Sequence, residues 1–118
     1  MQLKLTTRTV DGIIVVDCVG RIVLGEESAD LRDTVKQLVA KGARIVLNLG
    51  GVNYIDSSGL GTLVSLYTTA QTGGASIKLA SLTKRVGDLL QVTKLLTVFD
   101  VYDNEQQALD SFRKGAAA

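Results

Sequence analysis

The stretch that decides the fold runs from Asn48 to Gly61 and reads Asn-Leu-Gly-Gly-Val-Asn-Tyr-Ile-Asp-Ser-Ser-Gly-Leu-Gly. It overlaps a short apolar segment, residues 45–49, that is typical of a strand buried on both faces of a sheet. After this strand we expect a short loop and then an amphipathic helix that begins at Asp56, a favourable N-cap because its carboxylate accepts hydrogen bonds from free amides of the first turn. The apolar face of this helix is expected to carry Leu60, Leu63, Val64 and Tyr67.

Two serines, Ser57 and Ser58, open this helix at the positive end of its dipole, where negative charge is tolerated. A phosphate on one of them would add about −1.5 to −2 units of charge and three acceptor oxygens, and the fold should survive it. Gly59 and Gly61 each cost up to about 1 kcal/mol of helix propensity relative to alanine. They indicate that something approaches the backbone closely, either within the fold or from a partner. The alternative is a capped helix with no further role, and we predict instead that one serine is a modified residue and not a nucleophile.

The beginning of the chain predicts an antiparallel hairpin. Residues 3–9 alternate apolar with polar side chains, and residues 13–19 form a more apolar run. Between them lies Asp11-Gly12, a dipeptide favoured in tight two-residue turns. Gly20 is expected to end the second strand.

A helix is predicted between this hairpin and the central strand, over residues 28–41. Its apolar side chains recur at helical spacing, at Leu31, Val35, Leu38 and Val39. Gly42 stands where a helix C-terminal glycine is expected. Residues 21–27, which mix apolar and acidic side chains, are predicted only as a connection.

Beyond the central stretch, the helix that begins at Asp56 is expected to end at Gly73-Gly74, and a strand follows over residues 76–82. Thr83 is expected to cap a third helix. The buried side chains of that helix are Val86, Leu89 and Leu90.

The end of the chain predicts an edge strand over residues 98–102 and a last helix. Residues 103–106, Asp-Asn-Glu-Gln, resemble a capping box with Asp103 at the cap and Gln106 three residues on. A frayed tail is expected over residues 115–118. The buried side chains of the last helix are Ala108, Leu109 and Phe112.

These elements predict one α/β domain over residues 1–118, with its core between about 3 and 112. Their order is ββαβαβαβα. Strand–helix–strand units impose parallel neighbours with right-handed crossovers, whereas the opening hairpin adds an antiparallel pair. We therefore expect a mixed, mainly parallel five-stranded sheet packed with four helices.

The composition narrows the classes of function. The chain has 118 residues and a net charge of +1 without a basic stripe, which argues against nucleic-acid binding. It shows no signal peptide and no apolar run of membrane-spanning length, so we expect a cytoplasmic protein without membrane contact. Cys18 lies in an apolar run and is expected to be a small core residue.

The sequence also argues against an enzyme. Without histidine a Ser-His-Asp triad is impossible, and clusters of His and Cys cannot hold a metal ion. Neither serine fits a Gly-x-Ser-x-Gly elbow, because Gly59 follows Ser58 directly. Residues 59–62 lack the lysine of a phosphate-binding P-loop. We expect no catalytic residue, no metal and no cofactor.

The segments 45–49 and 52–61 together resemble the signature of the STAS domain, specifically of the bacterial anti-sigma factor antagonists. The similarity extends over about residues 3–112 and includes Gly73-Gly74 and the run Glu-Gln-Gln-Ala-Leu at 105–109. Asp-Ser-Ser-Gly-Leu-Gly is its specific part. This resemblance implies the same fold and a protein that works by binding a partner.

The resemblance further implies a partner switch controlled by phosphorylation. The unmodified antagonist would bind an anti-sigma factor that is also a serine kinase and thereby free a sigma factor for transcription. The kinase would phosphorylate the second serine, Ser58, and cause release, and a PP2C-type phosphatase would reset the switch. The residues expected to contact the partner are Asp56, Ser57, Ser58, Gly59, Leu60, Arg21 and Val23.

One segment departs from the family pattern. Where such antagonists often show Gly-x-Leu-Asp before the first helix, this chain has Gly-Arg-Ile-Val-Leu-Gly-Glu-Glu at 20–27. A scaffold role, or a transporter-associated subunit without a phosphoryl switch, is therefore the alternative. A small-ligand or nucleotide-binding domain, with its pocket beside Gly50-Gly51 and Ser58, is a third. The expected oligomeric state is a monomer, or a weak homodimer paired through the edge strand at 98–102.

Overall fold

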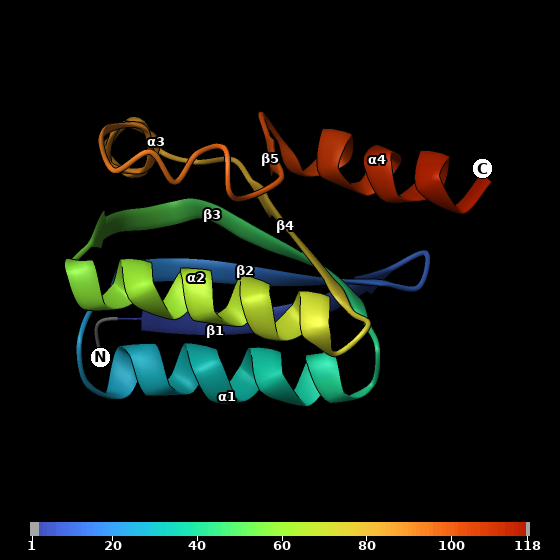
Figure 1. Ribbon diagram of the computed structural model, residues 1–118, viewed down its shortest axis with the longest axis horizontal. Helices are drawn as coiled ribbons and strands as arrows, with labels where there is room; N and C mark the ends of the chain where they lie inside the picture. Colours follow the sequence, from blue (N-terminus) through green and yellow to red (C-terminus); the bar gives the residue numbers. More distant parts are fainter. Residues whose placement is uncertain (1–2, 118) are drawn as a thin grey trace.

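Five strands form one mixed sheet, and four helices pack on its two faces (Figure 1). The computed structural model describes residues 3–117 of the chain. The predicted order ββαβαβαβα is confirmed. The elements are β1 (Leu3–Val10), β2 (Ile13–Ile22), α1 (Glu26–Ala40), β3 (Arg44–Ile55), α2 (Ser57–Thr72), β4 (Ser76–Ala80), α3 (Lys84–Val92), β5 (Val101–Tyr102) and α4 (Glu105–Ala117).

The strands lie side by side in the order in which they occur along the chain, from β1 to β5. β1 and β2 are antiparallel, and each later strand runs parallel to the one before it. The hairpin turn uses left-handed backbone at Asp11 (φ 52°) and Gly12 (φ 78°), as a tight turn between twisted strands requires. The mixed, mainly parallel sheet is therefore confirmed.

The helices divide into two pairs, with α1 and α2 on one side of the sheet and α3 and α4 on the other (Figure 1). Alternate residues of β2 serve the two sides: Val16 and Cys18 belong to the larger apolar cluster, and Ile13 and Val15 to a smaller one. The smaller cluster contains Ala108, Leu109 and Phe112 of α4, as the sequence predicted. Cys18 is confirmed as a core residue, and burial raises the pKa of its thiol to about 12.

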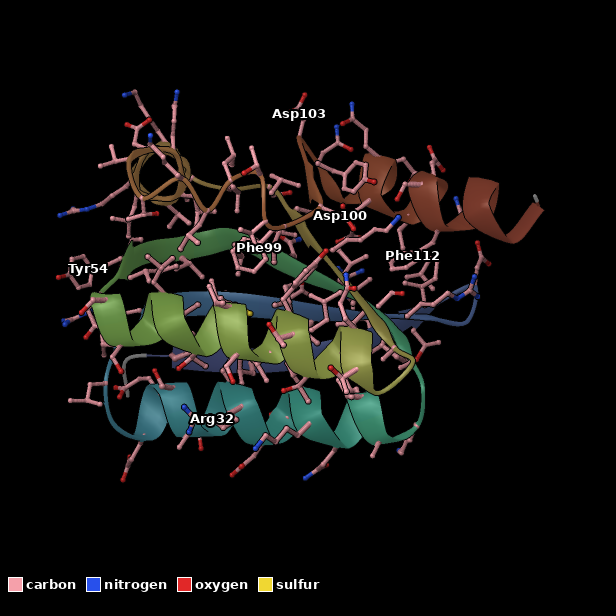
Figure 2. The ribbon with its side chains drawn as sticks, in the orientation of Figure 1. Arg32, Tyr54, Phe99, Asp100, Asp103 and Phe112 are labelled. Carbon is pink, nitrogen blue, oxygen red and sulfur yellow. The ribbon has the colours of Figure 1, made fainter. Side chains whose placement is uncertain are left out.

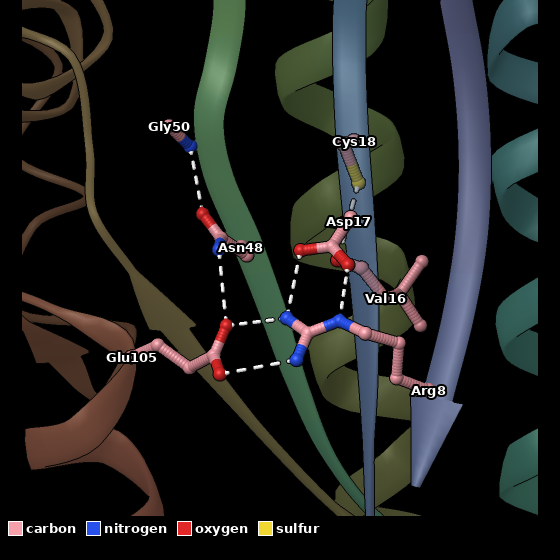
Figure 3. A network of polar contacts seen from close by, with 7 residues as sticks. All are labelled: Arg8, Val16, Asp17, Cys18, Asn48, Gly50 and Glu105. Carbon is pink, nitrogen blue, oxygen red and sulfur yellow. Dashed lines mark hydrogen bonds and ion pairs between the residues drawn. The ribbon is translucent and has the colours of Figure 1, made fainter.

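Polar side chains fix the start of α4 to the sheet (Figure 3). The Arg8 guanidinium in β1 pairs with Asp17 of β2 at 2.6 Å and with Glu105 of α4 at 2.5 Å. Glu105 also accepts a hydrogen bond from the Asn48 amide of β3 at 3.2 Å. Arg8 thus contacts a residue 97 positions further along the sequence.

The central strands are longer than predicted. β2 continues through Gly20 to Ile22, and β3 continues to Ile55, so the loop expected after Leu49 is wrong. The two strands remain paired to their ends, because register shifts at Asp17/Val19 and Gly20/Arg21 absorb the irregular residues. A Cβ at Gly51 would lie 2.9 Å from a methyl of Val19, so glycine there allows the two strands to stay close.

The last strand is shorter than predicted: β5 contains only the two residues Val101–Tyr102, whereas a strand over residues 98–102 was expected. Phe99 leaves the sheet and is buried, and its ring packs edge-on against Tyr67 of α2 at a centroid distance of 5.4 Å. Burial of this aromatic ring in the core takes the place of strand pairing there. So short an edge offers little backbone for the dimer pairing that was expected.

The helices α3 and α4 both begin with a side-chain cap, as predicted. Thr83 caps α3 through its hydroxyl, which accepts a hydrogen bond from the Val86 amide, as expected. The cap of α4 lies one residue later than predicted: Asn104 accepts from the Gln107 amide at 2.9 Å, and the Gln107 side chain accepts from the Asp103 amide. α4 continues to Ala117, through the residues where a frayed tail was expected to begin, and residue 118 lies outside the described part.

Candidate functional site

Asp56 joins the first turn of α2 to the segment that follows β2. One carboxylate oxygen accepts a hydrogen bond from the Gly59 amide at 2.7 Å, which confirms Asp56 as the N-cap. The other oxygen accepts from the Leu24 amide at 3.1 Å. These two amides stabilise the ionised form and lower the pKa of Asp56 below its ordinary value of 3.8.

Residues 21–27 lead from the end of β2 into the start of α1. Arg21 and Ile22 are the last residues of β2, a short turn follows, and α1 begins at Glu26, two residues before its predicted start. The Asp56 amide donates to the Ile22 carbonyl at 3.3 Å, and the Ser28 hydroxyl donates to the Val23 carbonyl at 2.6 Å. Arg21 and Val23, predicted to contact a partner, therefore lie beside the start of α2.

Packing against the end of β2 explains why position 59, one of two glycine positions in the first turn of α2, is a glycine. A Cβ at this position would lie 2.0 Å from the Ile22 carbonyl oxygen, so the close approach expected from the sequence is made within the fold. Gly61 is different, because it is exposed and a Cβ there would meet nothing within 4 Å. The fold requires glycine at the first position and leaves the backbone open at the second.

The two serines differ in exposure. Ser57 is exposed, whereas Ser58 is half-buried, and the Ser58 carbonyl accepts a hydrogen bond from the buried hydroxyl of Thr62 at 3.0 Å. Arg32 of α1, labelled in Figure 2, donates to the same hydroxyl at 3.4 Å, which ties the first turn of α2 to its neighbouring helix. Exposure alone favours Ser57 as the modified residue, and only the family resemblance selects Ser58.

A groove of about 650 Å³ lies between the start of α2 and the helix α3. Its lining includes Asp56, Ser57 and Leu60 from the predicted site, while Ser58, Gly50 and Gly51 are not part of it. Leu60 is 8% exposed and contributes mainly to the core. The lining residues that sequence reasoning missed are Tyr54, Ile55, Arg85, Val86, Asp88, Leu89, Val92 and Thr93.

Tyr54 stands at the end of β3, beside the first turn of α2 (Figure 2). Two guanidinium groups lie over its ring, that of Arg21 at 5.5 Å and that of Arg85 at 5.3 Å from the centroid. The three side chains, with Asn53, also line a second, shallower hollow. No sequence motif links these positions, because β2, β3 and α3 bring them together only in the folded chain.

Residues 3–117 contain no group of three or more His, Cys, Asp or Glu side chains arranged to hold a metal ion. Of the helices in the same range, none combines the length and apolar character that crossing a membrane demands.

The sheet order, the helix pairs and the Asp-capped serine turn define a class of protein, and the chain belongs to the STAS domain family, whose model matches residues 4–108. It is 34% identical over 71 residues to the anti-sigma-B factor antagonist of Bacillus subtilis strain 168. That match spans 60% of this chain and 65% of the Bacillus protein, slightly less than two thirds of the relative's length.

Solved structures share the fold. An anti-sigma factor antagonist from Mycobacterium paratuberculosis superposes with a TM-score of 0.80 at 23% identity, covering 94% of each chain. SpoIIAA in its unphosphorylated form superposes with a TM-score of 0.76 at 18% identity, covering 94% of this chain and 97% of that one. The phosphorylated form of SpoIIAA, from Bacillus, gives 0.68 at 17% identity, covering 93% and 98%.

Proposed function

We propose that this protein is an anti-sigma factor antagonist that binds an anti-sigma factor with serine kinase activity and is released when Ser58 is phosphorylated. It acts by binding and not by catalysis, in the cytoplasm where sigma factors work. A PP2C-type phosphatase returns it to the binding form. The family membership and the names of the relatives support the binding role.

The observation that carries the proposal is the capped serine turn at the start of α2. The Asp56 carboxylate, held by the Gly59 and Leu24 amides, fixes this turn at the surface. Both serines then lie at the positive end of a 16-residue helix, where a phosphate is favoured by the dipole. SpoIIAA, which shares the fold, has been solved in a phosphorylated form. A phosphate there alters the surface that a partner meets without requiring the core to change.

The experiment is a labelling reaction with ATP and purified anti-sigma factors of the serine-kinase class from the source genome, read by intact mass and phosphopeptide mapping. We expect one phosphate on the wild type and on Ser57→Ala, and none on Ser58→Ala. Ser65→Ala is the matched control, because Ser65 is an exposed serine on the same helix away from its first turn. Labelling that persists in Ser58→Ala and disappears in Ser57→Ala would move the site to the more exposed serine.

A binding measurement completes the test. Unmodified protein should bind the same kinase, and Ser58→Asp should bind it at least about tenfold more weakly, because a new charge meets an interface formed without it. The thermal midpoint of Ser58→Asp should stay within about 4 °C of the wild type, since Ser58 is only half-buried at a helix N-terminus. Equal binding by the two proteins would refute the switch.

A further inference from the structure

The groove between α2 and α3 has an apolar floor that nothing in the described chain covers. Leu60 and Val86 are buried and Leu89 is half-buried beneath it, while Val92 at the end of α3 is 79% exposed. Aliphatic surface left in this way beside a polar rim is typical of a contact site for another molecule.

The rim of the groove carries charges of both signs, with one more cation than carboxylates. Asp56 keeps its negative charge, because the two backbone amides stabilise its ionised form and the nearby Arg21 lowers its pKa further. Asp88 pairs with Lys84 at 3.1 Å. Arg21 and Arg85, which lie over the Tyr54 ring, form no ion pair with any described carboxylate. Three cations, Arg21, Arg85 and Lys84, stand against the two carboxylates of Asp56 and Asp88, so the rim carries a net charge of +1.

We propose that this groove binds an amphipathic segment of a partner protein, whose apolar side chains cover Leu89 and Val92 and whose carboxylates meet Arg21 and Arg85. Helix-in-groove contacts of this kind place an apolar stripe in the groove and charges along its rim. A small ligand fits less well, because sites for small molecules enclose most of the ligand. With Val92 and Tyr54 exposed, this groove is too open for that.

The positive charge of Arg21 and Arg85 explains how a phosphate would act as a switch, an argument that rests on the proposed function. Ser57 lines the groove and Ser58 is the next residue along the chain. A phosphate on either would place about −1.5 to −2 units of charge beside the two arginines. It would compete for the guanidinium groups and repel an acidic partner segment, so phosphorylation would weaken binding and not strengthen it.

The test uses two synthetic peptides of about 14 residues with leucines on one helical face. One carries glutamates on the flanks of that face, and the other carries lysine at each glutamate position. Titrated into ¹⁵N-labelled protein, the acidic peptide should shift the amide resonances of Tyr54, Leu89 and Val92, and the lysine peptide should not. Ser58→Asp should weaken binding of the acidic peptide, and added salt should do the same.

Charge reversal at the rim provides the matched variants. Arg85→Glu should lower the affinity for the acidic peptide at least about fivefold and raise the affinity for the lysine peptide. Lys36→Glu, an equal change of charge at an exposed position of α1 outside the groove, should alter the affinity less than about twofold. Arg85 is exposed, so Arg85→Glu is expected to fold, and its amide spectrum verifies this.

Three results would overturn the inference: equal binding of both peptides, resonance shifts confined to residues outside the groove, or Arg85→Glu binding the acidic peptide as the wild type does. Decanoate, an apolar carboxylate, serves as a small-molecule probe. If it produces the same shifts at concentrations below those of the acidic peptide, the groove is a small-ligand site. None of these measurements uses a kinase, so a failure of Ser58 labelling and a failure of peptide binding are distinguishable.

Discussion

Replacing Gly59 with alanine probes the contact that holds the first turn of α2 against the end of β2. The new Cβ would lie 2.0 Å from the Ile22 carbonyl oxygen and 2.8 Å from its carbon, both backbone atoms that cannot rotate aside. Overpacking of this kind typically costs about 1–3 kcal/mol, and a contact this short belongs at the upper end. Alanine recovers up to about 1 kcal/mol of helix propensity. The net loss in the free energy of unfolding is therefore about 2 kcal/mol.

The matched control is Gly61→Ala, two residues along the same helix turn. Apart from the backbone of its own helix and its chain neighbours, no atom lies within 4 Å of the Cβ that alanine would add at this position. Only the propensity gain therefore applies, and this variant should be up to about 1 kcal/mol more stable than the wild type. Urea unfolding followed by circular dichroism measures both changes. A Gly59→Ala midpoint equal to that of the wild type, or equal shifts for the two variants, would refute the close contact between α2 and β2.

Three further predictions follow from polar and buried groups. Because the pKa of Asp56 is lowered in the folded state, its ionised carboxylate stabilises the fold at neutral pH, and this contribution is lost as the pH falls below about 4. Asp56→Asn retains a capping oxygen but does not titrate, so it should lose less stability than the wild type in urea titrations between pH 6 and 3. The Cys18 thiol, with its pKa raised to about 12, should not react with a disulfide reagent at pH 8 until the protein is unfolded in urea, and rapid reaction of the native protein would contradict its burial. Arg8→Ala should cost less than about 1 kcal/mol, since its ion pairs are partly exposed, but should speed amide hydrogen exchange in the first turn of α4 more than elsewhere.

Local patterns were enough to predict the elements because their signals are contained within short windows. Helical spacing placed α1 at Leu31 and Val35, and the Asp11-Gly12 turn placed the hairpin. The extension of β3 was missed because Gly50 and Gly51 are unfavourable in strands when judged alone. Pairing with β2 along its whole length outweighs that preference, and it depends on a neighbour distant in sequence.

The candidate site was predictable in part for the same reason. Asp56, as a cap next to two serines, is a local signal, and the structure places its carboxylate as expected. The proximity of Arg85 to Tyr54 could not be predicted from the sequence, because it depends on how α3 packs on β3. Exposure favours Ser57, so the prediction of Ser58 as the phosphorylated residue rests on the family resemblance and not on burial or helix geometry.

The spatial order of the strands has a consequence for how the protein is made. Since each strand pairs with its predecessor in the chain, a ribosome that releases the protein from the N-terminus delivers every new strand to an open edge of the sheet. No strand has to enter between two that are already paired. The contact from Arg8 to Glu105 can form only after α4 has emerged, so β1 gains this partner after the strands and helices between them have been made.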